Sequence, residues 1–502
     1  KSISDIVEVV DWIKNNWDID ITLDDSIFEG YLTDWSNIQG KAIGLCRPKN
    51  NIESAIMIRT FYNLKMPYTI SAGRTNLTGS ATPKEGFIIS IENLNAVKPL
   101  LKGNTIVSST GIYLEDMRKE VLAQSNSQFY YPVDPTSRKD AMIGGTVSCN
   151  ASGFTPGEQG ATRYWVQGLE IIMPNGKVIK CQRGEYISKN AMFELDDQKF
   201  EIPTYNRPNI KNASGPYTCG EGDIDFIDLI IGSEGMFGLV TECKFRLKPR
   251  PNKYLDLFII LESEYEAIKF YYFLNQVRKL DQVTALEYFG YNCQSYMKNR
   301  NRFFKNESDV GIYLQVPLYE KSIEQECSDW LEIISKSEFN IEDQNIYVLN
   351  DEKNWNIFFE ARHSIPELAL KKTKELNGIS IITDTIVPPE NFTQFLEYTH
   401  ALIKEENIEY LLFGHLGDCH LHFHLIPNKK QEQVAISVYN KIIDTSSQLN
   451  GVYSAEHGTG RRKKIDFIKC YGYDAVDQIK YSKACVDPNM QVNRANIIDY
   501  KS

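Results

Sequence analysis

Residues 232–251 read GSEGMFGLVTECKFRLKPRP, a loop of small residues that runs into an apolar, strand-like segment and ends in Pro-Arg-Pro. Glycine and small hydroxyl residues let a backbone approach a phosphate closely and point successive N–H groups at it. Beyond this stretch the composition changes, and longer helical patterns alternate with short strands. We therefore expect a nucleotide-binding unit before residue 251 and a different unit after it.

Two further small-residue loops lie upstream, SAGRTNLTGS (71–80) and IGGTVSCNASGFTPGEQGATRYW (143–165). Any one of these loops alone is most simply a turn, but each of the three is bordered by a strand-like run. The sequence has no GxGxxG after its first strand and no GxxxxGK[ST], which disfavours a Rossmann dinucleotide site and a P-loop. The three loops together predict a different kind of nucleotide cradle.

The bulk properties are those of a globular protein of 502 residues, 42% hydrophobic and with a net charge of −11. This length predicts two or three compact units. The negative charge argues against nucleic acid as the main partner. No apolar run reaches the roughly 18–20 residues of a membrane span. The ten cysteines are scattered without a CxxC pair, which predicts free thiols in a reducing compartment and no iron–sulfur cluster in this chain.

Periodicity predicts the main elements. In the first half we expect a hairpin over 169–181 turning at Asn175-Gly176, the pair that a type I′ turn favours. A helix is expected over about 52–65, and strands over 41–46, 68–71, 87–92 and 105–110. In the second half the expected helices span about 261–279, 320–337, 390–405 and 429–448, and DVGIYLQV, ISIIT, YLLFG and HLHFHLI are expected strands.

Four of the seven histidines lie in GHLGDCHLHFH (414–424). In a strand, His420, His422 and His424 point to one face. A single histidine there would most simply be a satisfied polar group, but four with an aspartate in so short a span favour a metal site. Imidazole and carboxylate ligands suit Zn, Mn or Fe(II).

SAGRTNLTGSATP, YYPVDPTSRKDAMIGGTVSCNASG, GATRYWVQGLEIIMPNGKVI and IGSEGMFGLVTECKFRLKP resemble the FAD-binding domain of the vanillyl-alcohol-oxidase-type (PCMH-type) flavoproteins. GHLGDCHLHFH, SAEHGTGRRKK and VDPNMQVNRANI look like the HxGDGNxHxN, EHGxG and DPxGxxNPGK motifs of one branch of that family, the glycolate oxidase FAD subunits, D-lactate dehydrogenases and D-2-hydroxyglutarate dehydrogenases. The resemblance runs in order over about residues 40–497.

The resemblance implies an α+β fold, with a two-subdomain PCMH-type FAD-binding domain and a cap domain of antiparallel sheet and flanking helices. We place the FAD-binding domain at 1–251, the substrate or cap domain at 252–445, and a C-terminal segment that completes the flavin site at 446–502.

Carried over by position, the resemblance assigns a pyrophosphate loop and a set of flavin contacts. The loop is Ala72, Gly73, Arg74, Thr75 and Asn76, and the contacts are Pro135, Thr136, Ser137, Gly144, Gly145, Asn150, Gly153, Thr162, Gly232, Glu234, Gly235, Gly238, Val240 and Asn493. Arg74 and Asn76 depart from the family's glycine-rich loop; asparagine tolerates left-handed angles, and the charge of Arg74 can pair with a phosphate oxygen. No His or Cys stands where some relatives attach flavin, so we expect non-covalent FAD.

The same resemblance assigns the chemistry. His415, His422 and Glu456 map to the metal ligands, His457 to the catalytic base and Arg362 to the substrate carboxylate. The departures lie beside these residues. Cys419, His420 and His424 replace a glycine and two asparagines of the motif. These side chains either contact the metal ligands from outside or change which metal the site prefers. Ile382 stands where a substrate-binding lysine is common, which argues against a dicarboxylate substrate.

We therefore expect an FAD- and divalent-metal-dependent dehydrogenase of a small D-2-hydroxy acid, with D-lactate as the first choice. The alternatives are an alkylglycerone-phosphate-synthase-like transferase, a flavin-free metallohydrolase and a non-catalytic FAD-holding subunit. The expected acceptor is separate: an electron-transferring flavoprotein, an iron–sulfur subunit, a quinone or a cytochrome. A cytoplasmic location is expected, either free or peripheral at the inner face of a membrane, as a homodimer or as part of a redox complex.

Overall fold

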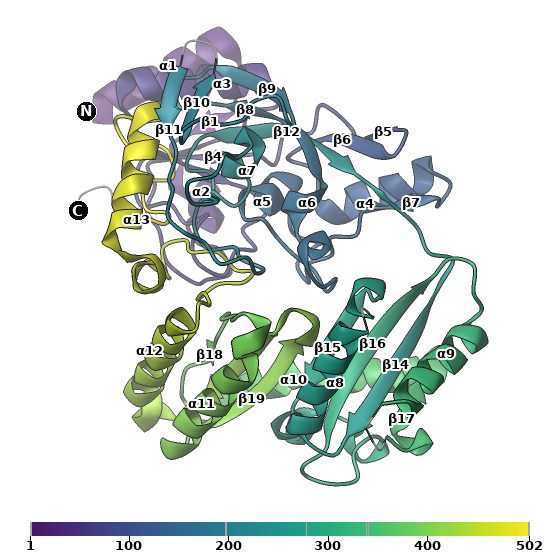
Figure 1. Cartoon of the computed structure of the whole chain (residues 1–502). Helices are drawn as coiled ribbons and strands as arrows, with labels where there is room; N and C mark the ends of the chain where they lie inside the picture. The colour runs from purple at the N-terminus through teal and green to yellow at the C-terminus, as the bar shows by residue number, and fades with distance from the viewer. Residues whose placement is uncertain (1–2, 196–197, 278, 338, 340, 500–502) are drawn as a thin grey trace.

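A computed structural model describes residues 3–195, 198–277, 279–337, 339 and 341–499 of the chain. The chain forms two parts that are seen one above the other in Figure 1. The first half and the last helix make up the upper part, and the segments between them make up the lower part. The polypeptide therefore leaves the upper part once and later returns to it.

A small mixed sheet lies in the upper part, with the strand order β1-β2-β4-β3. Strand β4 runs parallel to both β2 and β3, and helix α3 connects those two outer neighbours. Asn50 caps α3 by accepting a hydrogen bond from the N–H of Glu53, so this helix begins one residue before the expected start. The bounds are α1 Ile3–Trp17, β1 Ile21–Thr22, α2 Asp25–Phe28, β2 Gly44–Cys46, α3 Asn51–Leu64, β3 Tyr68–Ser71 and β4 Phe87–Ser90.

A five-stranded antiparallel sheet, β5-β6-β12-β8-β9, forms the second layer of the upper part. Its central strand β12 begins directly after the small-residue loop 231–238. The expected hairpin is present, but only Gly176 of the Asn175-Gly176 pair has a positive φ, 83°, so the turn is not type I′. The strands are β5 Leu100–Lys102, β6 Thr105–Ser109, β8 Val166–Ile172, β9 Val178–Gln182 and β12 Leu239–Arg246.

Short helices and two small strand pairs surround this sheet. The helices are α4 Leu114–Gln124, α5 Ile143–Ser148, α6 Thr162–Trp165 and α7 Phe226–Ile230. The strand pairs are β7 Phe129–Tyr130 with β13 Lys248–Pro249, and β10 Met192–Leu195 with β11 Gln198–Glu201.

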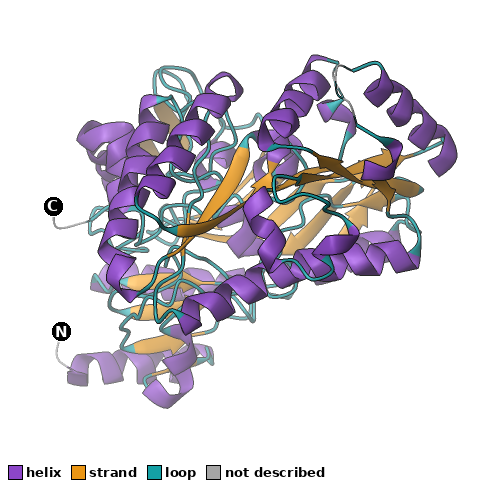
Figure 2. Cartoon of the chain, turned by 90° about the horizontal axis from the view of Figure 1, so that it is seen from below, coloured by secondary structure: helices purple, strands orange, loops and turns teal. Residues whose placement is uncertain are grey.

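The lower part is a seven-stranded antiparallel sheet, β17-β14-β16-β15-β19-β20-β18, flanked by helices (Figure 2). Its strands are β14 Lys253–Leu261, β15 Ala285–Phe289, β16 Val310–Leu318, β17 Ile346–Val348, β18 Ile381–Ile382, β19 Glu409–His415 and β20 His420–Ile426. Its helices are α8 Glu264–Gln276, α9 Ile323–Ser335, α10 Glu352–Glu375, α11 Phe392–Glu405 and α12 Glu432–Gln448. The expected α+β class, with an antiparallel cap sheet and flanking helices, is confirmed.

Helix α10 was not expected from the sequence, although its 24 residues make it long. Pro366 lies inside it, and a proline has no N–H to bond the carbonyl four residues earlier, here that of Arg362. Asp351 compensates at the other end by capping the helix through the N–H of Asn354. The helix presents Arg362 from its middle.

After α12 the chain returns to the upper part. At the start of this return, two isolated β-bridges connect it to the segment after β18: Ser454 pairs with Asp384, and Val452 pairs with Ile386. Helix α13, Lys464–Val486, then lies against the first half of the chain (Figure 1). Residue 445 falls in the last turn of α12, and β14 starts two residues after 251. The domain limits themselves stay predictions.

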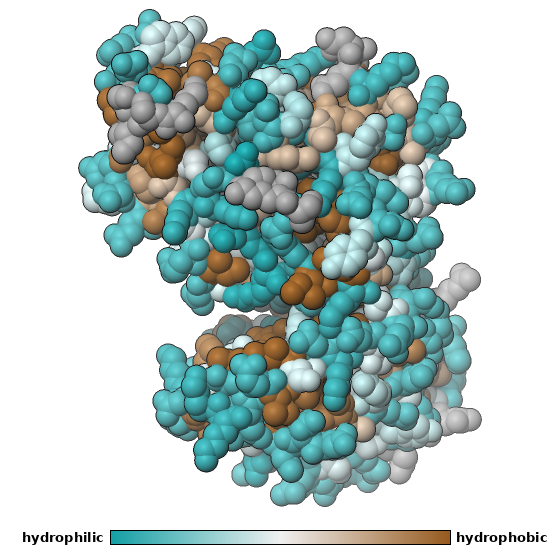
Figure 3. Space-filling model, turned by 90° about the vertical axis from the view of Figure 1, so that its left-hand side faces the viewer, coloured by the Kyte–Doolittle hydropathy of each residue, from teal (hydrophilic) through white to brown (hydrophobic). Residues whose placement is uncertain are grey.

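The surface is mainly hydrophilic on the face seen in Figure 3, where hydrophobic residues gather in separate patches. Among the described residues, no helix has the length and apolar character needed to cross a bilayer.

Candidate active site

An open cavity lies among the three small-residue loops. His415, Glu456 and His457 close one side of it. Most of the expected flavin contacts line it, namely Ala72, Gly73, Arg74, Thr75, Asn76, Pro135, Thr136, Ser137, Gly144, Gly145, Gly153, Glu234, Gly235, Gly238, Val240 and Asn493.

Three expected flavin contacts, Asn150, Thr162 and Gly232, do not line the cavity. The Asn150 Oδ1 accepts from the N–H of Arg163 at 2.9 Å, and the Thr162 hydroxyl donates to the Ala151 carbonyl at 2.7 Å. Gly232 donates its N–H to the Val147 carbonyl. These residues connect the loops behind the lining and so fix its shape.

The expected pyrophosphate loop packs tightly against its neighbours. A Cβ at Gly73 would lie 2.1 Å from the Asp140 carbonyl oxygen, so only glycine fits there. The Asn76 Oδ1 accepts from the N–H groups of Thr78 and Ser80, as an asparagine at a turn commonly does. The guanidinium carbon of Arg74 lies 4.3 Å from the centre of the Tyr31 ring, and its Nη1 donates to the Ala72 carbonyl at 3.4 Å.

Glu234 links the cavity to the segment after His457. It is 2% exposed and accepts hydrogen bonds from the backbone N–H groups of Thr459 and Gly460, at 2.7 and 2.8 Å. Burial raises the pKa of Glu234 to about 7, against the opposing effect of these N–H donors. Asn493 donates to the Glu234 carbonyl and accepts from the N–H of Ile70, so a residue late in the chain completes the lining.

The histidine-rich segment forms a compact cluster. His415 and His420 are directly opposite in the β19–β20 ladder, and His422 lies on the same face as His420. One donor atom from each of His415, His420, His422 and Glu456 lies within 4.8 Å of the others. The structure thus brings the three expected ligands together, and it adds His420.

Two imidazoles of this cluster, those of His415 and His422, have hydrogen-bonded outer partners. The His415 Nδ1 lies 2.7 Å from Glu287 Oε1, and the His422 Nδ1 lies 2.8 Å from the Thr383 carbonyl oxygen. Carboxylates and carbonyls in these positions orient metal-binding imidazoles and make them better donors. Burial and the charge of His415 lower the pKa of His422, which keeps that ring neutral.

Lys211 brings an ammonium group into the cluster. Its Nζ lies 2.5 Å from Glu456 Oε1 and 3.2 Å from Asp418 Oδ2, and its side chain is 4% exposed. Burial raises the pKa of Glu456, but Lys211 and His415 outweigh this effect and hold it well below its usual range. Lys211 could not be found from the sequence pattern, because the stretch NRPNIKNASGP around it has no periodicity.

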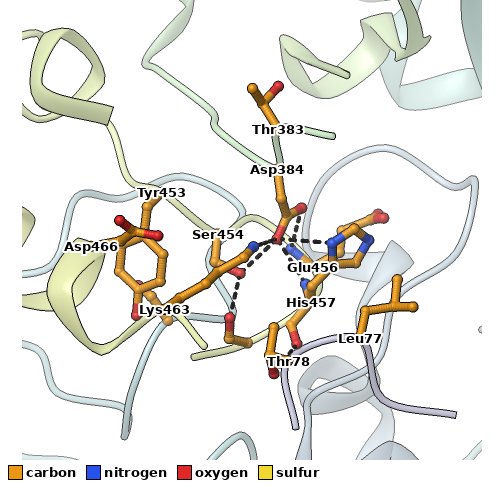
Figure 4. Close-up of polar contacts among 12 residues, drawn as sticks. Leu77, Thr78, Thr383, Asp384, Tyr453, Ser454, Glu456, His457, Lys463 and Asp466 are labelled. Atoms are coloured by element: carbon orange, nitrogen blue, oxygen red, sulfur yellow. Dashed lines mark hydrogen bonds and ion pairs between the residues drawn. The ribbon is translucent and has the colours of Figure 1, made fainter. Parts of the chain in front are cut away.

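Asp384 organises the segment that carries His457 (Figure 4). Its fully buried carboxylate accepts from the His457 N–H at 3.0 Å and from the Ser454 hydroxyl at 2.6 Å, and it lies 3.0 Å from Lys463 Nζ. The His457 Nδ1 lies 3.5 Å from the same oxygen of Asp384. Burial lowers the pKa of His457 to about 4, so the imidazole is neutral at pH 7.

Arg362 lies beside the cluster but does not line the cavity. Its Nη2 lies 3.9 Å from Glu287 Oε2, its guanidinium carbon is 4.7 Å from the centre of the Phe154 ring, and its side chain is 29% exposed. Ile382 is 44% exposed on β18 and also lies outside the lining.

His424 and Cys419, the other two residues that depart from the histidine motif, make contacts outside the metal-type cluster or are buried. The His424 Nε2 lies 2.7 Å from the Ser380 hydroxyl, away from the cluster. Cys419 is 2% exposed and has a φ of 56°, the conformation that explains a glycine at this place in the motif. Burial raises the pKa of its thiol. Neither residue contributes to the set of four donors.

Two family models match the chain. The FAD binding domain model matches residues 42–182, and the model of the C-terminal domain of FAD linked oxidases matches residues 277–497. The matched segments cover the small-residue loops up to β9 and the whole histidine cluster.

Curated relatives match over nearly the full length. The D-lactate dehydrogenase of Anaerostipes hadrus is 25% identical over 500 residues, covering 95% of this chain and 94% of the relative. The glycolate oxidase subunit GlcD of Bacillus subtilis (strain 168) is 24% identical, with 89% and 87% covered. The D-2-hydroxyglutarate dehydrogenase of Stutzerimonas stutzeri (strain A1501) is 24% identical, with 95% and 96% covered.

Solved structures show the same fold at 13% identity. A p-cresol methylhydroxylase structure aligns with a TM-score of 0.71 over 100% of this chain and 98% of the other. An alkyldihydroxyacetonephosphate synthase structure aligns with a TM-score of 0.68 over 98% and 85%.

Proposed function

The chain belongs to the FAD-linked oxidoreductases, and on that premise we propose that it is a dehydrogenase that oxidises a small D-2-hydroxy acid, D-lactate first, to the 2-oxo acid. The observation that carries the proposal is the position of His457. This neutral imidazole lies in the wall of a cavity built from the FAD-binding loops and stands next to Glu456 of the metal-type cluster.

The residues present fit FAD. Six glycines and seven serine or threonine residues line the cavity, and the loop at Gly73 has no room for a side chain. When bound, FAD supplies the acceptor for the Cα hydrogen and its electron pair. The match to FAD-binding domains also argues against the flavin-free hydrolase.

His457 has the arrangement of a general base. Its Nδ1 faces the Asp384 carboxylate, which leaves Nε2 free to accept the hydroxyl proton of the substrate. Asp384 remains charged, because His457 and Lys463 lower its pKa more than burial raises it. The Asp384 carboxylate orients the His457 ring and stabilises the imidazolium that forms. The ammonium group of Lys463 partly balances the negative charge of Asp384.

We propose that Arg362 binds the carboxylate of the 2-hydroxy acid and that the histidine cluster, through a metal ion, binds its hydroxyl group. A guanidinium can bind a carboxylate through two parallel hydrogen bonds. Phe154 and Glu287 support Arg362 from two sides and direct its free N–H groups. We propose His415, His422 and Glu456 as ligands of a Zn, Mn or Fe(II) ion, since these donors converge and the imidazoles have outer partners. Such an ion supplies a Lewis acid for the substrate hydroxyl.

The electron acceptor is proposed to be a separate protein or a quinone, because the ten cysteines of this chain are all free thiols. If the acceptor is a protein, the candidates are an electron-transferring flavoprotein, an iron–sulfur subunit and a cytochrome. The likeness to the synthase structure concerns the fold alone, and it does not favour alkyl transfer.

The test is anaerobic mixing of the FAD-loaded protein with a panel of D- and L-2-hydroxy acids, with and without a chelator. Loss of the oxidised flavin's visible absorbance with small D-acids, and stoichiometric 2-oxo acid, is the expected result. The panel includes dicarboxylates such as D-2-hydroxyglutarate, and comparing their rates of flavin reduction with that of D-lactate shows whether the site prefers small substrates. If no hydroxy acid reduces the flavin, the proposal is wrong.

A further inference from the structure

His420 is a fully buried histidine whose ring nitrogens make no hydrogen bond of ordinary geometry with the described residues, although its Nε2 faces the Asp384 carboxylate. It is 0% exposed. An imidazole buried without partners costs free energy, because each polar atom has lost its water. Such an atom in a native structure calls for a group that occupies it.

The surroundings of His420 indicate which group. Its ring centre lies 4.6 Å from that of His422 and 5.6 Å from that of His415. One of its nitrogens belongs to the set of four donors that converge within 4.8 Å. Its Nε2 lies 3.1 Å from Asp384 Oδ1, so His420 has an outer carboxylate just as His415 has Glu287. This is the pattern of a metal-binding imidazole.

We propose that His420 is a fourth protein ligand, so that the site of this chain is His415, His420, His422 and Glu456. The inference rests on the metal site of the proposed function and goes beyond it, because the motif that this chain resembles has an asparagine at position 420. A third imidazole favours Zn or Fe(II) over Mn, which prefers oxygen donors. It also leaves fewer positions for the substrate hydroxyl.

His424 provides a matched control. It lies on the same face of β20 two residues further on, it is 2% exposed, and it bonds to the Ser380 hydroxyl outside the cluster. His420→Asn and His424→Asn therefore make the same chemical change in equally buried positions of one strand. FAD content and the thermal unfolding temperature show that each variant has folded.

The experiment measures affinities of the FAD-loaded wild type and both variants for Zn²⁺ and Mn²⁺ by competition with a chelating dye. Loss of a direct ligand should weaken Zn²⁺ binding by more than about 100-fold, above the effect of losing an outer partner, and it should reduce the preference for Zn²⁺ over Mn²⁺. His424→Asn should change neither quantity by more than about threefold. Equal affinities of wild type and His420→Asn would overturn the inference, and so would a wild type that binds no metal.

A second variant tests ligation directly and does not depend on the loss of a side chain. His420→Cys loaded with Co²⁺ should show a thiolate-to-metal charge-transfer band in the near ultraviolet, which His424→Cys should lack. Absence of the band in a folded, Co²⁺-containing His420→Cys protein contradicts the proposal. These readouts need no turnover. Tight metal binding without oxidation of any hydroxy acid would count against the proposed function alone.

Discussion

The oxygen of Asp384 that accepts the backbone N–H of His457 also lies 3.5 Å from the ring Nδ1 of the same histidine. One carboxylate thus fixes both the main chain and the ring of the proposed base. This oxygen belongs to the lower part of the molecule, whereas the loop around Asn76 that donates to the His457 carbonyl belongs to the upper part. His457 is therefore held from both parts.

Replacing His457 by alanine should preserve FAD binding and lower turnover by about 10²- to 10⁴-fold, the usual contribution of a general base. The reason is that the variant lacks the proton acceptor but keeps the backbone contacts to Asp384 and Asn76. Flavin content and the rate of anaerobic flavin reduction provide the measurement. His363→Ala, on the exposed face of α10, is the control. An unchanged reduction rate in His457→Ala would refute the assigned role.

Replacing Arg362 by methionine should raise KM for the hydroxy acid more than it lowers kcat. Hydrogen bonds to charged groups contribute about 1.5–3 kcal/mol, which corresponds to about a tenfold to hundredfold loss. Steady-state kinetics with a dye acceptor separates the two constants. Arg362→Lys should recover only part of the loss, because an ammonium cannot form the paired contacts of a guanidinium. A KM equal to that of the wild type would show that the carboxylate binds elsewhere.

Chelation should remove activity while flavin remains bound. Dialysis against a chelator is expected to lower the rate of flavin reduction by D-lactate at least about 100-fold, consistent with loss of a Lewis acid worth several kcal/mol. Zn²⁺ or Mn²⁺ should restore the rate in the wild type but not in His422→Ala. A chelated enzyme that keeps its full rate would mean that the metal cluster is not catalytic.

Replacing Lys211 by methionine should destabilise the protein by about 3–5 kcal/mol in the absence of divalent cations, because the buried carboxylates of Glu456 and Asp418 would then lose the ammonium group that they share. Added Zn²⁺ should raise the unfolding temperature of the variant more than that of the wild type. Lys298→Met removes an exposed ion pair and should cost less than about 1 kcal/mol. Identical denaturation curves for Lys211→Met and the wild type would contradict this role.

Glu234 should make stability fall as pH rises. Its folded pKa of about 7 lies above the ordinary value of 4.5, so the folded state keeps the proton longer than the unfolded chain does. Its contribution is complete below pH 4.5 and is lost as pH rises through 7; at about 1.4 kcal/mol per pKa unit the loss is about 3 kcal/mol.

Urea unfolding at a fixed, saturating FAD concentration over this pH range provides the comparison for Glu234. The difference in unfolding free energy between Glu234→Gln and the wild type should grow by that amount as pH rises. Parallel pH profiles would show that the carboxyl group titrates normally.

Local pattern was sufficient for much of the fold. HLHFHLI alternates and forms β20, and YTIS forms β3 between a proline and a small-residue loop. Helix α10 could not be predicted in this way, because Pro366 in its middle is a strong signal against a helix, and tertiary packing of residues such as Phe358 and Ile365 outweighs that signal.

The site was predictable only where its residues are close in sequence. His415, His422 and Glu456 belong to two short motifs, and the structure brings them together. Asp384 lies two residues after Ile382 but had no role assigned from the sequence, and Lys211 is more than 200 residues from its partner Glu456. A charged residue that meets its partner only in the folded chain cannot be recognised from local periodicity in the sequence.

Val492 bridges Tyr68, and the side chain of Asn493 accepts from Ile70 and reaches the Glu234 carbonyl. A nascent chain on the ribosome therefore lacks the part of the cavity lining that Asn493 provides until position 493 has emerged from the exit tunnel. A message that stops shortly before this codon should therefore yield protein that holds less flavin than a chain that includes Asn493.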